Sequence, residues 1–291
     1  MTSKVTTQAR LRHEQINVKD VSIHVVQGGR SEQPSILFLH GWPESWALYE
    51  QVMVGLGDTA HVVAIDLPGV GLSESAPSGN DKKTLAKYVK GVIQALGLRD
   101  VTLVGHDCGG MVAYAYIKAY PDNLKSAVIM NTVIPGVEPW AKVISNPYIW
   151  HFAFHSIPEL PEQLVTGRED AYFDYFFNIL AGPKGVSEEL RERFTYANCR
   201  PKALHNGFEW YRAFAQDAKD NAADKDKAVD IPVLYLRGDH ENADIETYLK
   251  GLRENGLKHV KGQIIPDSGH FSPSENPEAT IEALRKFVTA H

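Results

Sequence analysis

One short stretch of the sequence, residues 101–110, carries an acidic residue in a position that suits a nucleophile. It contains the pattern Gly105-His-Asp-Cys-Gly109, which follows four residues of apolar and β-branched type and precedes a run with helical character at residues 111–120. A strand, a sharp turn and a helix around G-x-S-x-G expose the central side chain for attack on a substrate. In this chain the central residue is Asp107, so the predicted nucleophile is a carboxylate.

A histidine and several acids follow the nucleophile in the chain order nucleophile, acid, histidine. His270 lies after the last apolar run and is the predicted general base. Three acids follow the preceding apolar run. Glu241, three residues after Gly238, has the usual offset for the acid of this arrangement and is preferred, while Asp239 and Asp244 stay open as alternatives.

A carboxylate nucleophile favours a different reaction from a hydroxyl. Attack by a carboxylate on a saturated carbon forms an ester in which the enzyme supplies the acyl part, and water then hydrolyses that acyl group. This chemistry suits the opening of an epoxide or the displacement of a halide. His270 would activate the water, and Glu241 would orient the imidazole and offset its developing charge.

Backbone amides near the nucleophile are expected to stabilise the oxyanion that forms during hydrolysis of the ester. The stretch His40-Gly-Trp-Pro43 lies at the end of an early apolar run. In this arrangement the oxyanion is held by the N–H after such a glycine and by the N–H after the nucleophile. The predicted donors are therefore the backbone amides of Trp42 and Cys108.

Composition argues against several classes of function. The 291 residues carry a net charge of -6, without the basic stripe that nucleic-acid binding needs. The N-terminal residues are polar, and no run approaches the roughly 18 apolar residues of a membrane span, so a cytoplasmic protein with no membrane partner is expected. Cys108 and Cys199 are the only cysteines, which argues against a disulfide framework or a cysteine-based metal site. No metal or organic cofactor is expected.

The elements that position these residues alternate between strands and helices. Short apolar runs indicate strands buried on both faces of a parallel sheet, and they cover residues 35–40, 61–66, 101–104, 127–130, 233–236 and 263–265. Helical patterns include residues 83–96 and 278–288, in the order typical of βαβ units. Residues 14–26 alternate around Lys19-Asp20 and predict a hairpin on the antiparallel edge of the sheet.

One long segment interrupts this alternation. Residues 137–225 contain no strand-like run and are rich in aromatic side chains. We interpret them as a helical lid between two parts of an α/β core, residues 1–136 and 226–291, at a strand end where ligands of open α/β sheets bind. Most of the lid aromatics are expected to pack within it. Four are predicted to contact an apolar substrate: Trp150, Phe152, Phe154 and Phe177.

Taken together, the motifs resemble the α/β-hydrolase fold superfamily. They are HGWP, DLPGVGLS at residues 66–73, GHDCGG and DSGHF, and the resemblance covers the chain from about Glu14 onward. It implies the α/β-hydrolase fold, a mostly parallel twisted sheet flanked by helices with a helical lid insertion. The Asp at the sharp turn resembles the epoxide hydrolase and haloalkane dehalogenase branch of the superfamily.

The lid motifs closely resemble those of Cif-like epoxide hydrolases. Many epoxide hydrolases supply two lid tyrosines, and Phe208-Glu-Trp-Tyr-Arg212 is similar to the motif of the second one, which implies Tyr211. The place of the first tyrosine falls in residues 149–154, which contain none but resemble the Cif-like segment with a histidine. The resemblance therefore implies that His151 and Tyr211 act on the opening epoxide ring, since a neutral histidine can donate a hydrogen bond in place of a phenol.

One departure from the Cif-like pattern concerns the acid. The secreted prototype resembles a hydrolase with a Glu directly after the strand that precedes the lid, whereas this chain has Asn131 there. An asparagine cannot supply that charge. Glu241 then inherits the role through the other common location of the acid.

The resemblance implies an epoxide hydrolase that opens a small apolar epoxide to a vicinal diol with water. A haloalkane or haloacid dehalogenase with the same nucleophile is the alternative. Cys108 and Met111 stand where fluoroacetate dehalogenases carry arginines, which disfavours a haloacid, but Trp42 and Trp150 could both face a halide and leave a neutral haloalkane open. The second alternative is a non-catalytic ligand receptor on the same fold. The oligomeric state is open, with a homodimer as one option.

Overall fold

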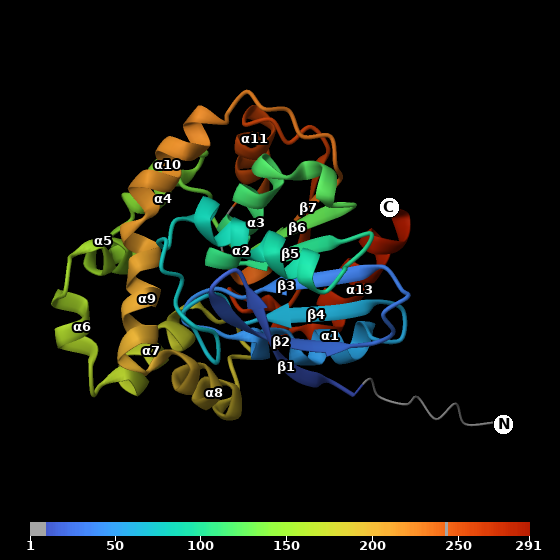
Figure 1. The fold of residues 1–291 in the computed structure, drawn as a ribbon. Coiled ribbons are helices and arrows are strands. Elements are labelled where there is room, and N and C mark those ends of the chain that lie inside the picture. The colour runs from blue at the N-terminus through green and yellow to red at the C-terminus, as the bar shows by residue number, and fades with distance from the viewer. Residues whose placement is uncertain (1–9, 242–243) are drawn as a thin grey trace.

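A mostly parallel sheet provides the frame for the predicted site. The structure, a computed structural model, describes residues 10–241 and 244–291 (Figure 1). Its eight-stranded sheet has the order β1-β2-β4-β3-β5-β6-β7-β8. The strands are β1 Arg12–Val18, β2 Val21–Gly28, β3 Ser35–Leu39, β4 His61–Ile65, β5 Thr102–His106, β6 Ser126–Met130, β7 Val233–Gly238 and β8 Val260–Ile265.

The two edges of the sheet differ in strand direction. β1 and β2 form the predicted antiparallel hairpin, with Lys19 at the turn in a left-handed conformation, φ 57°. β2 also pairs antiparallel with β4, and all the other neighbours are parallel. β8 forms the opposite edge and begins at Val260, before the apolar run that predicted it. Four of its six residues are exposed, so the strand does not need apolar side chains there and its first residues carry no apolar pattern.

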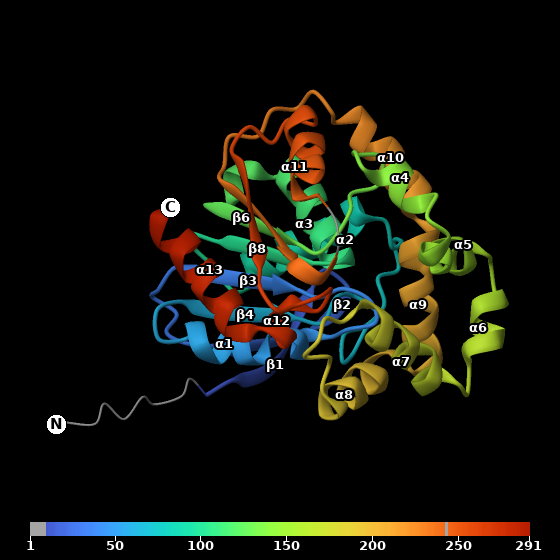
Figure 2. The same cartoon turned by 180° about the vertical axis from the view of Figure 1, so that it is seen from behind.

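Helices cover both faces of the central strands. β3, β4, β5 and β6 are buried along their whole length, with α2, α3 and α11 on one face and α1 and α13 on the other (Figure 1 and Figure 2). The predicted helices at residues 83–96 and 278–288 are confirmed as α2 and α13. The helices outside residues 137–225 are η1 Trp46–Tyr49, α1 Glu50–Leu56, α2 Lys82–Ala95, α3 Cys108–Ala119, η2 Pro121–Asn123, η4 Asp239–Glu241, α11 Ile245–Glu254, α12 Ser272–Glu275 and α13 Pro277–Ala290.

Residues 137–225, called the lid segment below, fold into helices, turns and loops. The segment leaves the sheet after β6 and returns at β7, which is the neighbour of β6, and its helices α5, α6, α7 and α9 lie to one side of the sheet (Figure 1). None of the helices in the described residues is both long enough and apolar enough to cross a membrane. The lid helices are α4 Trp140–Ile144, η3 Pro147–Ile149, α5 Trp150–Ser156, α6 Leu160–Val165, α7 Glu169–Leu180, α8 Glu188–Asn198, α9 Pro201–Arg212 and α10 Phe214–Ala223.

A buried ion pair joins the lid segment to the core. Lys82, at the start of α2, and Asp217, in α10, are each 2% exposed. The Lys82 ammonium lies 2.9 Å from Asp217 Oδ2 and donates to the Trp210 carbonyl at 2.7 Å, while the Lys82 amide donates to Asp217 Oδ1 at 2.8 Å. The Phe214 ring lies over the ammonium, 4.7 Å from ring centre to nitrogen. Because both charges are removed from water, each depends on the other for compensation.

Replacement of Asp217 by Asn is expected to lower the free energy of unfolding by about 3 kcal/mol, because the Lys82 charge stays buried without its counter-ion. Urea denaturation at neutral pH measures the change. The double variant Lys82→Met with Asp217→Leu removes both charges and should recover most of the loss. Equal destabilisation of the single and the double variant would show that shape, and not charge pairing, maintains this contact.

Candidate active site

The turn that carries Asp107 has a strained backbone. Asp107 lies between β5 and α3 with φ 49° and ψ -124°, a conformation that L-residues rarely adopt. Close packing requires glycine on both sides. A Cβ at Gly105 would lie 2.2 Å from the Gly109 carbonyl oxygen, and a Cβ at Gly109 would lie 2.4 Å from the Leu39 carbonyl oxygen. The two glycines of the motif therefore allow the turn that presents the carboxylate at the end of β5.

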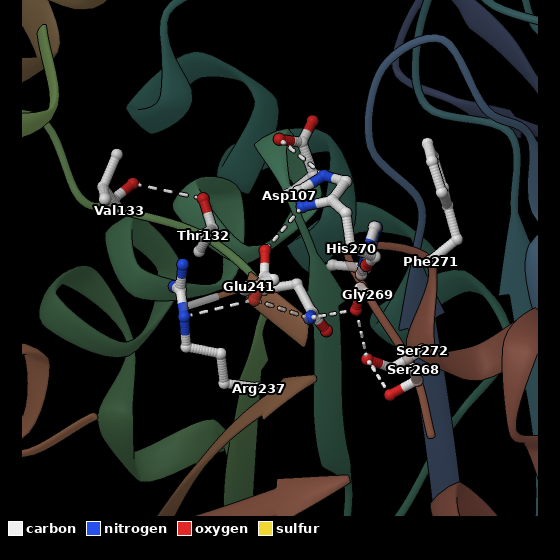
Figure 3. Close-up of polar contacts among 12 residues, drawn as sticks. Asp107, Thr132, Val133, Arg237, Glu241, Ser268, Gly269, His270, Phe271 and Ser272 are labelled. Atoms are coloured by element: carbon white, nitrogen blue, oxygen red, sulfur yellow. Dashed lines mark hydrogen bonds and ion pairs between the residues drawn. The ribbon is translucent and has the colours of Figure 1, made fainter. Parts of the chain in front are cut away.

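His270 lies between two carboxylates (Figure 3). Its Nε2 is 3.6 Å from Asp107 Oδ2, and its Nδ1 is 3.0 Å from Glu241 Oε1. The other oxygen of Glu241, Oε2, is 3.2 Å from Arg237 Nε. The four side chains form a row of alternating charge that starts at the end of β5 and finishes on β7.

Of the three acids considered from the sequence, Glu241 is the one that contacts His270. Asp239 accepts two backbone amides from the loop at residues 266–271, both at 3.0 Å. Asp244 accepts an amide in the first turn of α11 and caps that helix. The side chains of both alternatives are thus engaged in holding local structure.

Asn131 occupies the place that the acid has in the alternative arrangement. It follows β6 with φ 48°. Its Nδ2 donates to Glu241 Oε2 at 3.0 Å and to the Gly269 carbonyl oxygen at 3.2 Å. One amide group therefore binds both the acid and the loop that carries His270. The sequence pattern marked this position as a departure but did not reveal these contacts.

The neighbouring carboxylates determine the protonation state of His270. Burial by itself lowers the pKa of His270, but the hydrogen bonds and charges of Asp107 and Glu241 outweigh burial and raise that pKa to about 10. Burial acts to raise the pKa of Asp107, yet His270 holds it below its usual range. Arg237 and His270 likewise hold the pKa of Glu241 low against the effect of burial. At neutral pH His270 is therefore an imidazolium between two carboxylates.

The turn after β3 brings a backbone amide to Asp107. The Trp42 amide donates to Asp107 Oδ1 at 2.9 Å. Gly41 permits this approach, because a Cβ there would lie 2.4 Å from the Cβ of Asp107. Cys108, which carries the other predicted donor, begins α3 directly after Asp107. Both predicted donors therefore adjoin the same residue.

Two fully buried residues that the sequence pattern did not identify connect three loops of the site. Glu44 Oε2 accepts the Gly41 amide at 2.7 Å and lies 3.0 Å from His106 Nδ1. His106 Nε2 donates to the His270 carbonyl oxygen at 2.6 Å. The turn after β3, the turn after β5 and the His270 loop are thereby joined. The signal in the sequence was a polar residue next to each motif, in HGWPE and in GHD.

A cavity of about 550 Å³ adjoins Asp107 and His270. His151 of α5 and Tyr211 of α9 line the same cavity, with ring centres 5.8 Å apart. Burial lowers the pKa of His151 to about 4 and raises the pKa of Tyr211 well above its usual value. Both side chains are therefore neutral at pH 7, and each carries a hydrogen that it can donate.

Of the four aromatics expected to contact the substrate, Phe152 lines the cavity. Trp150 and Phe154 do not belong to the lining. Trp150 is 38% exposed, and its Nε1 donates to the Tyr175 hydroxyl at 3.2 Å. Phe154 packs against Trp150, with ring centres 5.8 Å apart. Side chains two positions apart on a helix differ in direction by roughly 200°. When Phe152 faces the cavity, Trp150 and Phe154 therefore face away from it.

Phe177 does not belong to the lining either. Phe177 is fully buried and packs against Phe194 and Phe271, with ring centres 5.8 and 5.6 Å apart. Its neighbour Phe176 lines the cavity instead. Adjacent helical residues differ by about 100° in direction, and a Phe-Phe pair in the sequence does not reveal which of the two faces the ligand.

The fold and the site define the class to which this protein belongs. Residues 34–277 match the family model of the alpha/beta hydrolase fold, and the chain belongs to that family. The predicted fold class is thereby confirmed.

Within the family the chain is similar to proteins named epoxide hydrolases. It is 31% identical to the soluble epoxide hydrolase of Corynebacterium sp. (strain C12), over 95% of this chain and 97% of the relative. The crystal structure of Cfl2 from Burkholderia cenocepacia shares 32% identity and a TM-score of 0.87, over 96% of both chains. The Cif epoxide hydrolase from Acinetobacter nosocomialis shares 26% identity and a TM-score of 0.86, over 95% of this chain and 88% of that one. The predicted resemblance to Cif-like epoxide hydrolases is confirmed.

The raised pKa of His270 predicts how stability depends on pH. The pKa of His270 is about 10 in the folded protein, above the ordinary 6.5. The protonated histidine therefore stabilises the fold fully below pH 6.5, and this stabilisation is lost as the pH rises toward 10. This one group should lower the free energy of unfolding across that window by up to about 1.4 kcal/mol per pH unit. Urea denaturation at a series of pH values measures the slope. His270→Gln should remove this contribution, while the exposed control His259→Gln should keep it, and an unchanged slope in His270→Gln would contradict the imidazolium.

Proposed function

We propose that this protein is an epoxide hydrolase that adds water to a small apolar epoxide and forms a vicinal diol. The observation that carries the proposal is one cavity lined both by an anionic Asp107 in contact with His270 and by the neutral donors His151 and Tyr211. Ring opening needs an anion for attack and donors for the departing oxygen. Similarity to epoxide hydrolases over nearly the whole chain supports the proposal.

In the first step a carboxylate oxygen of Asp107 attacks an epoxide carbon, and the bond from that carbon to the epoxide oxygen breaks. We assign the attack to Oδ2, since the Trp42 amide already binds Oδ1 at 2.9 Å. The electron pair stays on the epoxide oxygen, which takes a proton from Tyr211 and a hydrogen bond from His151. The product is an ester between Asp107 and a hydroxyalkyl group.

Formation of the ester changes the state of His270. The ester is uncharged, so one of the two carboxylates that raise the His270 pKa is lost. The imidazolium then releases its proton, which replaces the one that Tyr211 gave to the substrate oxygen. The neutral imidazole takes a proton from water as the water oxygen attacks the carbonyl carbon of the ester. The amides of Trp42 and Cys108 stabilise the oxyanion. Its collapse breaks the bond from the acyl carbon to the alkoxide oxygen, which takes the proton of the hydroxyl that water added and leaves as the diol, so Asp107 is again a carboxylate and His270 again an imidazolium.

The two indole groups argue against a haloalkane dehalogenase. A halide leaving group needs N–H donors, and the sequence offered Trp42 and Trp150. The Trp42 Nε1 is buried against α9, where a Cβ at Gly207 would lie 2.8 Å from it. The Trp150 Nε1 donates to the Tyr175 hydroxyl at 3.2 Å. The Trp150 N–H is thus engaged outside the cavity lining and the Trp42 N–H is packed against α9, which supports an epoxide as the substrate rather than a halide.

Trapping of the ester tests the proposed reaction. In His270→Gln and in Glu241→Gln, hydrolysis of the ester should be slower than in the wild type by on the order of 100-fold. Each variant should therefore form the ester faster than it hydrolyses it. Incubation with styrene oxide should then add the mass of one whole epoxide to the protein, as measured by intact-protein mass spectrometry. Asp107→Ser is the control and should gain no mass. A gain of one alkyl group after incubation with 1-bromohexane would support a dehalogenase, and no adduct from either reagent would contradict both reactions.

Removal of a lid donor should affect the first step of the reaction. Tyr211→Phe and His151→Phe are each expected to slow ester formation by on the order of 100-fold, because the departing oxygen loses a donor. Stopped-flow single-turnover measurements with styrene oxide separate this step from ester hydrolysis. Tyr175→Phe removes a hydroxyl at the lid surface and serves as the matched control. Wild-type rates of ester formation in both lid variants would assign the two residues to packing alone.

A further inference from the structure

The loop that carries His270 is bound through three consecutive backbone amides. The His270 amide donates to the carbonyl oxygen of Leu180, at the end of α7, at 2.9 Å. The amides on either side, those of Gly269 and Phe271, both donate to Glu275 Oε1, at 3.1 and 2.9 Å. A single carboxylate oxygen therefore holds the main chain on both sides of the histidine.

The second oxygen of Glu275 binds the lid segment. Glu275 is 3% exposed, and its Oε2 accepts the Gly182 amide at 2.5 Å. Gly182 and Gly269 cross in close contact. A Cβ at Gly182 would lie 2.6 Å from the Gly269 nitrogen, and a Cβ at Gly269 would lie 2.3 Å from the Gly182 nitrogen. The Glu275 carboxylate thus joins two glycine turns, one beside the histidine and one in the lid segment.

The position of His270 matters most when its attraction to Asp107 is absent. In the free enzyme the imidazolium and the Asp107 carboxylate attract each other across 3.6 Å. Formation of the ester removes the negative charge from Asp107, and loss of a proton removes the positive charge from His270. The imidazole then has to hold its place against the ester carbonyl by its contact with Glu241 and by the fixation of its own main chain.

We propose that Glu275 is a positioning residue for ester hydrolysis, which holds the His270 main chain through the Gly269 and Phe271 amides and anchors it to the lid segment through Gly182. The inference rests on the proposed function, because it concerns the second step of that reaction. Glu275 acts through His270 and does not touch the reacting atoms. Ester formation relies on Asp107 and the lid donors, so loss of Glu275 should leave that step largely intact.

The variant Glu275→Gln tests this role with little change of shape. A carboxamide has one accepting oxygen and one donating nitrogen, so either the Gly182 amide or both loop amides lose their acceptor. Stopped-flow single turnover with styrene oxide, combined with mass spectrometry of quenched samples, measures ester formation and ester hydrolysis separately. Hydrolysis is expected to slow by on the order of 10-fold to 100-fold, with ester formation near the wild-type rate. Glu278→Gln, the same substitution at an exposed position of α13, is the control.

A second variant reaches the same contact from the lid segment. Gly182→Ala places a methyl group against the Gly269 nitrogen and should also slow hydrolysis more than ester formation, so it carries the test if Glu275→Gln does not fold. Both rate constants are measured per molecule that forms the ester, so the folded fraction does not enter them. Equal slowing of both steps would contradict a role specific to ester hydrolysis, and unchanged hydrolysis would overturn the inference.

The same experiment separates this inference from the proposed function. Glu241→Gln, measured in parallel, should accumulate the ester for the reason given above. If Glu241→Gln accumulates the ester while Glu275→Gln hydrolyses it at the wild-type rate, the positioning role of Glu275 is wrong and the reaction stands. If no variant forms an ester with styrene oxide, the proposed function itself is contradicted.

Discussion

A row of four buried or half-buried charges of alternating sign is the interaction on which the site depends. Asp107, His270, Glu241 and Arg237 follow one another at separations of 3.6, 3.0 and 3.2 Å. Each charge is acceptable inside the protein because its neighbours compensate it, and removal of one leaves the next uncompensated. The row involves three separate loops, so groups outside the row must hold those loops in fixed positions relative to one another.

Polar groups outside the row hold the three loops together. Glu44 and His106 connect the turns after β3 and β5 to the His270 carbonyl. Asn131 binds the acid and the His270 loop together. Their contacts are mostly with backbone groups, which have few ways to move once the strands beneath them are buried on both faces. The rigid sheet therefore fixes the positions of side chains that come from distant parts of the sequence.

Trp42 contacts both Asp107 and the lid segment. Its backbone amide binds Asp107 Oδ1, while its ring packs edge-on against Phe176, His155 and Tyr211, with ring centres 5.2, 4.6 and 5.5 Å away. This aromatic surrounding removes water from the cavity wall, which keeps the lid histidine and tyrosine uncharged. One part of the cavity is thus strongly charged and another is neutral, which suits the proposed attack of an anion on a neutral epoxide ring.

Features that depend on neighbouring residues could be predicted from the sequence. Buried strands require apolar runs, and a sharp turn around Asp107 requires Gly105 and Gly109. Both requirements are local, so the sheet and the turn at Asp107 could be predicted from the sequence, and the order of the motifs placed His270 after the last strand. The three-dimensional fold was needed to show which acid contacts His270, which aromatic rings face the cavity, and that Glu275 binds the amides beside the histidine. Those outcomes depend on distances between segments far apart in the chain and on the rotation of each helix about its axis, neither of which a linear pattern records.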